Sequence, residues 1–198
     1  MTVIGLTGGI ASGKSTVSSY LRQKGIPIFD ADACAWDVEK KGEPCLAALV
    51  RAFGTEILTP EGELDRAKMA DVAFHDKKAL AMLNAIVHKA IEEKRDAFLQ
   101  AHEGEPLVIV DAPLLLECGW EKLVDQVWVV SISEEEQIRR AMARSGMSRQ
   151  EVVDRIHRQM PLAEKTKQAD VVIDNSGGLE QLYKQVDALL DVRRETCV

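Results

Sequence analysis

The 198-residue sequence predicts an α/β protein, a three-layer fold with a five-stranded parallel sheet, a helical insertion and a helical lid. Three observations support this prediction. Five short apolar runs recur along the chain, segments with helical periodicity separate them, and a glycine-rich loop pattern directly follows the first run. The length suits one domain with an inserted subdomain, because it is sufficient to bury a substantial core.

The loop pattern G-x-x-x-x-G-K-[ST] spans Gly8 to Ser15, between the apolar run Val3–Leu6 and an expected helix Ser15–Gln23. Strand, loop and helix in this order are the context that the pattern requires. Because glycines lack a β-carbon, backbone N–H groups can turn toward phosphate oxygens, and the helix adds the positive end of its dipole. We predict ATP contacts from Gly9, Ile10, Ala11, Ser12, Gly13, Lys14, Ser15 and Thr16, with the Ser15 hydroxyl on Mg²⁺. A glycine-rich turn that binds nothing is the disfavoured alternative.

The second apolar run, Ile26–Phe29, leads into Asp30 and Asp32. In an open parallel sheet the carboxyl ends of the strands line the ligand crevice, so these acids are expected at the same cleft as the loop. An aspartate there can accept the proton of an attacking hydroxyl or ligate Mg²⁺. We expect one of the two only to cap the helix that follows.

Residues 33–103 contain no strand-like run and predict a helical insertion. The clearest helix spans Asp76 to Gln100, and His88 lies near its apolar stripe. That histidine can hydrogen-bond a substrate, although a histidine in such a place is more often a packing or surface residue. The stripe consists of Leu80, Leu83, Val87, Ile91 and Phe98.

The third run, Leu107–Asp111, ends in an acid and resembles a Walker B strand, which makes Asp111 a second candidate ligand of Mg²⁺. The loop after it carries Leu114 and Glu117, and it can hold an organic substrate or be ordinary core. Val127–Val130 and Val171–Asp174 complete the five strands. The predicted core therefore comprises residues 1–32, 104–138 and 168–198.

Between the last two strands, the twenty residues 139–158 contain only Glu151 and Asp154 as acids but six arginines, at positions 139, 140, 144, 149, 155 and 158. Guanidinium groups pair with phosphate oxygens in a planar, bidentate way, and a closing helical lid can bring them over ATP and exclude water. The alternative is a solvated helix face with ordinary ion pairs. For the set as a whole we favour a lid, residues 139–167.

Asn175 follows the last strand, at the same sheet edge as the loop. Its amide can bind the edge of a base, or it can be a turn residue before the glycines.

The composition excludes several classes of protein. Lys and Arg number 25 against 32 Asp and Glu, and a net charge of −7 argues against a nucleic-acid binder. No signal pattern and no bilayer-spanning apolar stretch is present, so we expect a cytoplasmic protein that contacts no membrane. The four cysteines are scattered, which argues against a disulfide framework and a zinc site.

Further segments occur in a fixed order along nearly the whole chain. They are Leu6–Ser15, Asp30-Ala31-Asp32, Leu83–His88, Pro113–Glu117, Glu136–Arg140, Gln159-Met160-Pro161 and Ala169–Asn175. In this ordered set the sequence resembles the dephospho-CoA kinase family.

The resemblance implies a P-loop kinase fold and transfer of the ATP γ-phosphoryl group to the ribose 3′-hydroxyl of dephospho-CoA, with Mg²⁺ as cofactor. It implies that Asp32 is the base and that Lys14 and Arg140 act with it in catalysis. It also places Arg144 and Asn175 at ATP, the latter at adenine, and His88, Leu114 and Glu117 at the acceptor. A monomer or weak homo-oligomer is expected.

Two positions depart from the family's pattern. Ala11 stands where the family usually has Gly, which is tolerable if its φ is negative. Lys89 stands where a proline is usual and weakens the placement of His88.

Two rival functions remain open. The first is another small-molecule P-loop kinase, for a nucleoside monophosphate or a sugar. The second is a GTPase-like switch, which is disfavoured because no Asn-Lys-x-Asp segment is present.

Overall fold

The computed structural model of the chain describes residues 1–196, which form two compact units. One unit comprises Met1–Phe29 and the chain from Gly104 onward, and the other comprises Asp30–Glu103. Within the described residues, no helix has the length and apolar character needed to cross a membrane.

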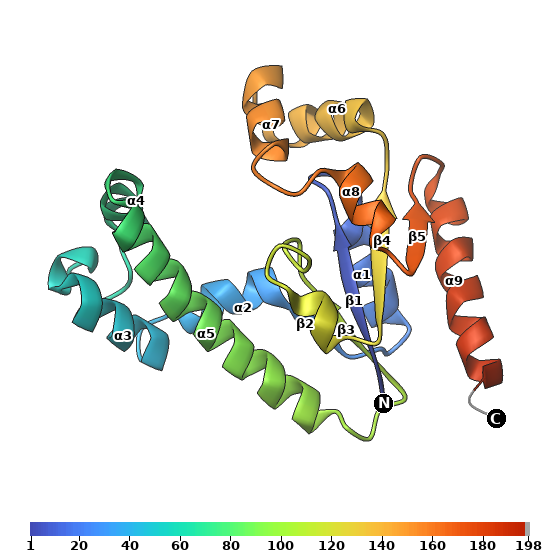
Figure 1. Cartoon of the computed structure of the whole chain (residues 1–198), viewed down its shortest axis with the longest axis horizontal. Helices are drawn as coiled ribbons and strands as arrows, with labels where there is room; N and C mark the ends of the chain where they lie inside the picture. The colour runs from blue at the N-terminus through green and yellow to red at the C-terminus, as the bar shows by residue number, and fades with distance from the viewer. Residues whose placement is uncertain (197–198) are drawn as a thin grey trace. The chain divides into compact units, whose positions relative to one another are not determined.

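A five-stranded parallel sheet forms the centre of the first unit, in the strand order β2-β3-β1-β4-β5 (Figure 1). This result confirms the predicted sheet. The strands are β1 (Thr2–Gly8), β2 (Ile28–Asp30), β3 (Leu107–Asp111), β4 (Gln126–Ser131) and β5 (Val171–Asp174). Strand β1 lies between β3 and β4, and its Leu6 is in register with Asp111 on one side and Trp128 on the other.

Helices α1 (Lys14–Gln23) and α9 (Leu179–Thr196) cover one face of this sheet, where Val17, Leu21 and Val186 pack on Ile4 and Leu6. Side chains alternate along a strand, so Gly5 faces the opposite side. There a β-carbon on Gly5 would lie only 2.5 Å from Leu115 Cδ1. The segment after β3, which includes the short 3₁₀ helix η2 (Trp120–Leu123), therefore packs directly on the sheet backbone.

Three helices lie between β4 and β5, namely α6 (Glu134–Ser145), α7 (Arg149–Ile156) and α8 (Leu162–Lys167). Helices α6 and α7 have an apolar core of their own, formed by Ile138, Ala141, Val152 and Ile156. Gly146 ends α6 in the left-handed conformation, and the hydroxyl of Ser148 begins α7 with a capping box.

The second unit is helical, as the sequence predicts. It comprises α2 (Ala31–Val38), α3 (Pro44–Phe53), the 3₁₀ helix η1 (Thr55–Ile57), α4 (Arg66–His75) and α5 (Lys77–Ala101). Helix α5 packs against α2, α3 and α4. Of its predicted apolar stripe, Ile91 is buried but Leu80 is exposed. Periodicity identifies the apolar face of a helix, but it does not show how far along the helix its packing partners extend.

Candidate active site

The loop between β1 and α1 is held in shape by its own backbone and by close neighbours. Ser12 N–H donates to Gly9 O at 3.1 Å, and Thr16 N–H donates to Gly13 O at 2.9 Å. Gly13 has a φ of 98°, and a β-carbon there would lie 2.0 Å from Asn175 Nδ2. Only glycine satisfies both conditions, because the conformation is left-handed and the space is already filled.

Gln137 is a second neighbour of the loop, and sequence reasoning gave it no role. This buried side chain of α6 lies so close to Gly9 that a β-carbon there would be 2.3 Å from Gln137 Oε1. The available signal was an uncharged amide side chain in the first turn of a helix that is otherwise rich in charged residues. Gln137 restricts where the loop backbone can lie.

Lys14 and Asp111, which come from different parts of the sequence, meet in the structure. Lys14 Nζ lies 2.5 Å from Asp111 Oδ1, and the carboxylate is buried. The pairing follows from topology, because β3 runs beside β1 and ends where the loop begins. A lysine for phosphate oxygens and an acid for the metal shell are thus adjacent, as the Walker B interpretation expects.

Asn175 lies against the phosphate loop and is buried. Its side-chain Nδ2 donates to the backbone carbonyl oxygen of Ser12 at 2.7 Å, and the backbone carbonyl oxygen of Asn175 accepts a hydrogen bond from Arg140 Nη2 at 3.0 Å. The residue therefore links α6 to the loop. Its amide nitrogen braces the protein backbone here, whereas the adenine contact implied by the resemblance stays a prediction.

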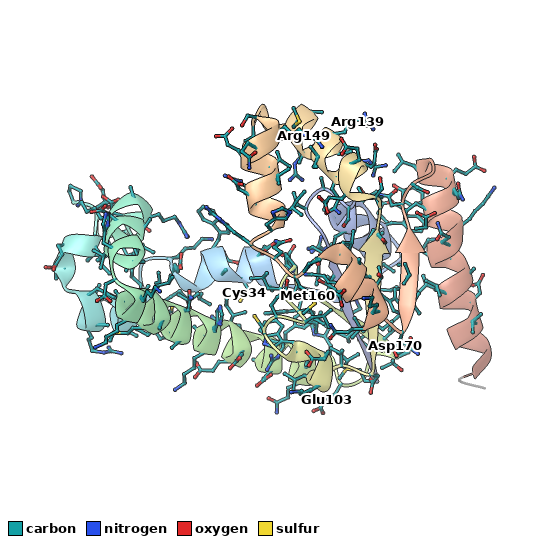
Figure 2. The ribbon with its side chains drawn as sticks, turned by 45° about the horizontal axis from the view of Figure 1, so that its top comes forward. Cys34, Glu103, Arg139, Arg149, Met160 and Asp170 are labelled. Atoms are coloured by element: carbon teal, nitrogen blue, oxygen red, sulfur yellow. The ribbon has the colours of Figure 1, made fainter. Side chains whose placement is uncertain are left out.

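Several arginines of the predicted lid form ion pairs with acids of α6. Arg139 and Arg140 both bind Glu136, and together, with Arg139 first, they lower the pKa of that carboxyl to about 2. Glu136 therefore stays charged at any pH near neutrality. Arg149 of α7 pairs with Glu135 at 2.6 Å, and Figure 2 shows Arg139 and Arg149 on their two helices.

These acids lie just before the arginine-rich stretch, so a count over that stretch misses them. Helical spacing of three and four residues brings Glu136 to Arg139 and Arg140, and packing of α7 on α6 brings Glu135 to Arg149. Arg144 is exposed in the last turn of α6. The paired arginines agree with the ion-pair alternative for those residues, and Arg140 is also directed to the loop through Asn175.

Ala11 adopts a φ of 55°, so the condition under which its methyl group would be tolerated without strain, a negative φ, is not met. The left-handed conformation brings a β-carbon close to the neighbouring carbonyl oxygen, and the loop geometry imposes it regardless of the residue. The Ala11 methyl packs with Ile10 against the core of α6 and α7, and this contact offsets part of the conformational strain.

The two aspartates after β2 have different environments. Asp30 caps α2, since its Oδ1 accepts the Ala33 N–H at 3.0 Å, which confirms that one of the pair is a cap. Asp32 lies in the first turn of α2 and is exposed. In α5, His88 and Lys89 are both exposed, and Lys89 lies 4.0 Å from Glu93.

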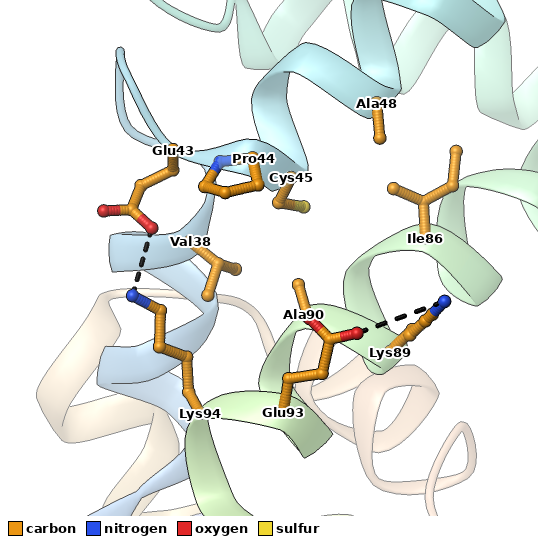
Figure 3. A pocket seen from close by; sticks show the side chains of 10 residues that line it. All are labelled: Val38, Glu43, Pro44, Cys45, Ala48, Ile86, Lys89, Ala90, Glu93 and Lys94. Carbon is orange, nitrogen blue, oxygen red and sulfur yellow. Dashed lines mark ion pairs between the residues drawn. The ribbon is translucent and has the colours of Figure 1, made fainter. Parts of the chain in front are cut away.

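The helical unit contains a cavity of about 420 Å³ between α2, α3 and α5 (Figure 3). Val38, Cys45, Ala48, Ile86 and Ala90 provide an apolar lining, and the ion pair Glu43–Lys94, at 3.1 Å, lies at its edge. Burial raises the pKa of the Cys45 thiol to about 11, so this cysteine is a protonated, weakly reactive group.

The two predicted acceptor residues after β3 differ in their contacts. Leu114 is 41% exposed, as a residue that meets a ligand can be. Glu117 instead binds inside the unit, to Lys165 Nζ at 2.9 Å and to the Met160 N–H at 2.9 Å.

Metal binding would have to rely on few protein groups. Among the described residues, no cluster of three or more His, Cys, Asp or Glu side chains could hold a metal ion. Cys34 and Cys45 are free thiols, and Cys197 lies outside the described residues. An exposed hydroxyl at Ser15 and a carboxylate at Asp111 are hard oxygen donors, and Mg²⁺ takes its remaining ligands from phosphates and water.

A phosphate loop between a central parallel strand and a helix, with its lysine beside an acid from the next strand, defines a P-loop nucleotide-binding protein. The family model described as dephospho-CoA kinase matches residues 2–181. The chain is 46% identical to the dephospho-CoA kinase of Carboxydothermus hydrogenoformans, over 96% of this chain and 93% of the relative. It belongs to the dephospho-CoA kinase family.

Two solved structures are similar to this chain over nearly its whole length. The protein TT1252 from Thermus thermophilus matches with a TM-score of 0.81 and 40% identity, covering 96% of both chains. Dephospho-CoA kinase from Campylobacter jejuni matches with a TM-score of 0.74 and 25% identity, covering 98% of both.

Replacing Ala11 by Gly tests the strain in the loop. Relief of the left-handed conformation, worth about 1–2 kcal/mol, should offset the lost methyl contact and the added freedom of the unfolded chain. We expect A11G to change the free energy of unfolding by less than about 0.5 kcal/mol in urea titrations, whereas A85G, at an exposed site within α5, should lower it by about 1 kcal/mol. A larger loss for A11G than for A85G would contradict the strain.

Proposed function

We propose that this protein transfers the γ-phosphoryl group of ATP to the 3′-hydroxyl of the dephospho-CoA ribose, with Mg²⁺ as the metal, and so forms coenzyme A. The observation that carries the proposal is the phosphate loop with Lys14 at Asp111, in a chain that matches the family model over residues 2–181. Helices of residues 30–103 supply a separate unit for the acceptor.

An acceptor screen tests this function. ATP consumption should rise strongly with dephospho-CoA and stay near background with AMP, shikimate or gluconate, and the product should be coenzyme A by mass. Stimulation by one of the other acceptors alone would favour the rival small-molecule kinase, and GTP-selective binding without phosphoryl transfer would favour a switch.

In the proposed reaction, the oxygen of the ribose 3′-hydroxyl attacks the γ-phosphorus of ATP. The Asp32 carboxylate accepts the proton that this hydroxyl loses. The bond from that phosphorus to the β–γ bridging oxygen breaks, and ADP leaves. Lys14 and Arg140 neutralise the charge on the transferring group, while loop N–H groups hold the other phosphates. When bound, Mg²⁺ would supply further charge neutralisation, with Ser15 and Asp111 as its protein ligands.

Topology supports the role of Asp32. Asp32 lies two residues after the end of β2, in the first turn of α2, and parallel strands present their carboxyl ends at one edge of the sheet. Of the two aspartates there, Asp30 already serves as the helix cap. Arg144 on α6 joins Asn175 in the proposed ATP site, and His88 and Leu114 are proposed acceptor contacts.

The pair of aspartates offers a matched test of the base. D32N should keep its affinity for ATP and lower kcat by roughly 10²–10⁴, the range for loss of a positioned base. D30N should stay close to wild type, because asparagine caps helices as well as aspartate does. Steady-state kinetics and ATP titrations of both variants decide the matter, and wild-type turnover of D32N would exclude it as the base.

We further propose that the cavity in the helical unit holds the pantetheine arm of the acceptor. Its apolar lining suits the methylene and methyl groups of the arm, and the charged groups at its edge suit the amides. Burial keeps the Cys45 thiol protonated, and a protonated thiol is weakly reactive toward the arm.

Filling this cavity tests the location. A90L places a larger side chain in the lining and should raise KM for dephospho-CoA about tenfold, the effect of roughly 1.4 kcal/mol of lost binding, with ATP affinity unchanged. A81L, at an exposed position of the same helix, serves as the control. Equal KM values for the two variants would place the arm elsewhere.

A further inference from the structure

Lys165 of α8 is the most deeply buried charged side chain among those described, with no exposed side-chain surface. Its Nζ lies 2.5 Å from the carbonyl oxygen of Pro113 and 2.9 and 3.1 Å from the two carboxylate oxygens of Glu117. A lysine ammonium has three N–H donors, and three acceptors surround it. The charge is therefore both paired and hydrogen-bonded, the condition under which a buried charge is tolerated.

The partners of Lys165 lead to three separate segments. The Pro113 carbonyl also accepts the hydroxyl of Thr7 at 3.0 Å, and Thr7 is the buried residue directly before the phosphate loop. Pro113 itself lies two residues after Asp111, in the loop that follows β3. Glu117 Oε1 also accepts the Met160 N–H at 2.9 Å, in the connection between α7 and α8.

That connection is where the arginine-bearing helices return to the sheet, and Met160 is labelled in Figure 2. Just beyond it, Leu162 of α8 approaches the phosphate loop, since a β-carbon on Gly9 would lie 3.4 Å from Leu162 Cδ2. One ammonium group thus joins the start of the phosphate loop, the segment after Asp111 and the end of the arginine-rich segment.

We propose that the Lys165–Glu117 pair is a positioning element of the phosphoryl-transfer site. It holds the connection after α7 at a constant distance from the phosphate loop, so that the arginines of α6 and α7 meet the transferring group in one geometry. Glu117 acts here through Lys165 and Met160 rather than on the acceptor. The inference rests on the proposed function of the arginines.

If the pair positions the arginines, its removal should reduce the rate of phosphoryl transfer more than the binding of ATP. ATP is held in the ground state mainly by N–H groups of the loop, and the loop's own hydrogen bonds to the Gly9 and Gly13 carbonyls do not involve Lys165. The arginines matter most when charge develops during transfer, and a displacement of about 1 Å in such a group can lower the rate by about 10². Removing the pair should therefore lower kcat and leave the affinity for ATP unchanged.

The test uses three variants, E117Q, K165M and the double variant E117Q/K165M. E117Q leaves the buried Lys165 charge without its partner and should destabilise the fold most, whereas K165M leaves the partly exposed Glu117 unpaired and should destabilise it less. The double variant removes both charges, so its melting temperature should return toward that of the wild type. The methionine at position 165 of the double variant cannot donate a hydrogen bond to the Pro113 carbonyl. We therefore expect kcat to be lower by roughly 10- to 100-fold, with the Kd for ATP unchanged.

K167M is the matched control. Lys167 lies two residues further along α8 and pairs with Glu164 on an exposed face, at 2.7 Å. Loss of that pair should leave kcat, Kd and melting temperature close to wild type.

A double variant that regains stability and also turns over at the wild-type rate would overturn the proposal, because the pair would then be purely structural. An equal loss of ATP affinity and kcat would overturn it as well. The wild-type protein is assayed with dephospho-CoA in the same experiment. If the wild type is inactive, the proposed acceptor is wrong, and this outcome is distinct from a failure of the positioning role.

If the double variant does not fold, T7V decides instead. It removes only the hydroxyl that ties β1 to the Pro113 carbonyl and keeps the charge pair. A several-fold lower kcat with unchanged ATP affinity supports the positioning role, and wild-type kcat overturns it.

Discussion

Two buried amides limit where the phosphate loop can lie, and the geometry of the site depends on this constraint. Gln137 presses on Gly9 and Asn175 on Gly13, at distances that leave no space for a β-carbon. Asn175 also holds the Ser12 carbonyl, which prevents that part of the loop from turning outward. The loop's glycines therefore serve close packing as much as conformational freedom.

The same contacts connect the loop to the helices between β4 and β5. Gln137 and Arg140 belong to α6, and the Ala11 methyl packs on the core that α6 shares with α7. Lys165 adds a polar link at the far end of this segment. In a protein with a net charge of −7, the cations are thus kept near the phosphate site by particular carboxylates rather than by an overall positive field.

Several roles could be predicted because they depend on local pattern. The five apolar runs identified the strands, and the position of Asp111 at the end of one of them made it a candidate ligand of Mg²⁺; its contact with Lys14 was not predicted. The cap at Asp30 followed from its place before a helix. The acid partners of the arginines were missed, since Glu135 and Glu136 lie outside the stretch in which the arginines were counted. The positive φ of Ala11 could not be predicted, because the surrounding loop sets it and the residue type does not.

The sequence by itself determined the sheet, the place of the phosphate loop and the helical character of residues 33–103, because periodicity and residue spacing are local properties. Only the tertiary structure decided which groups contact the loop and that the Glu117 carboxylate binds Lys165 and the Met160 N–H. Ser12 and Asn175 are 163 positions apart, and Glu117 and Lys165 are 48 apart. Such contacts form only when the strands are aligned, and strand order depends on packing that no single segment encodes.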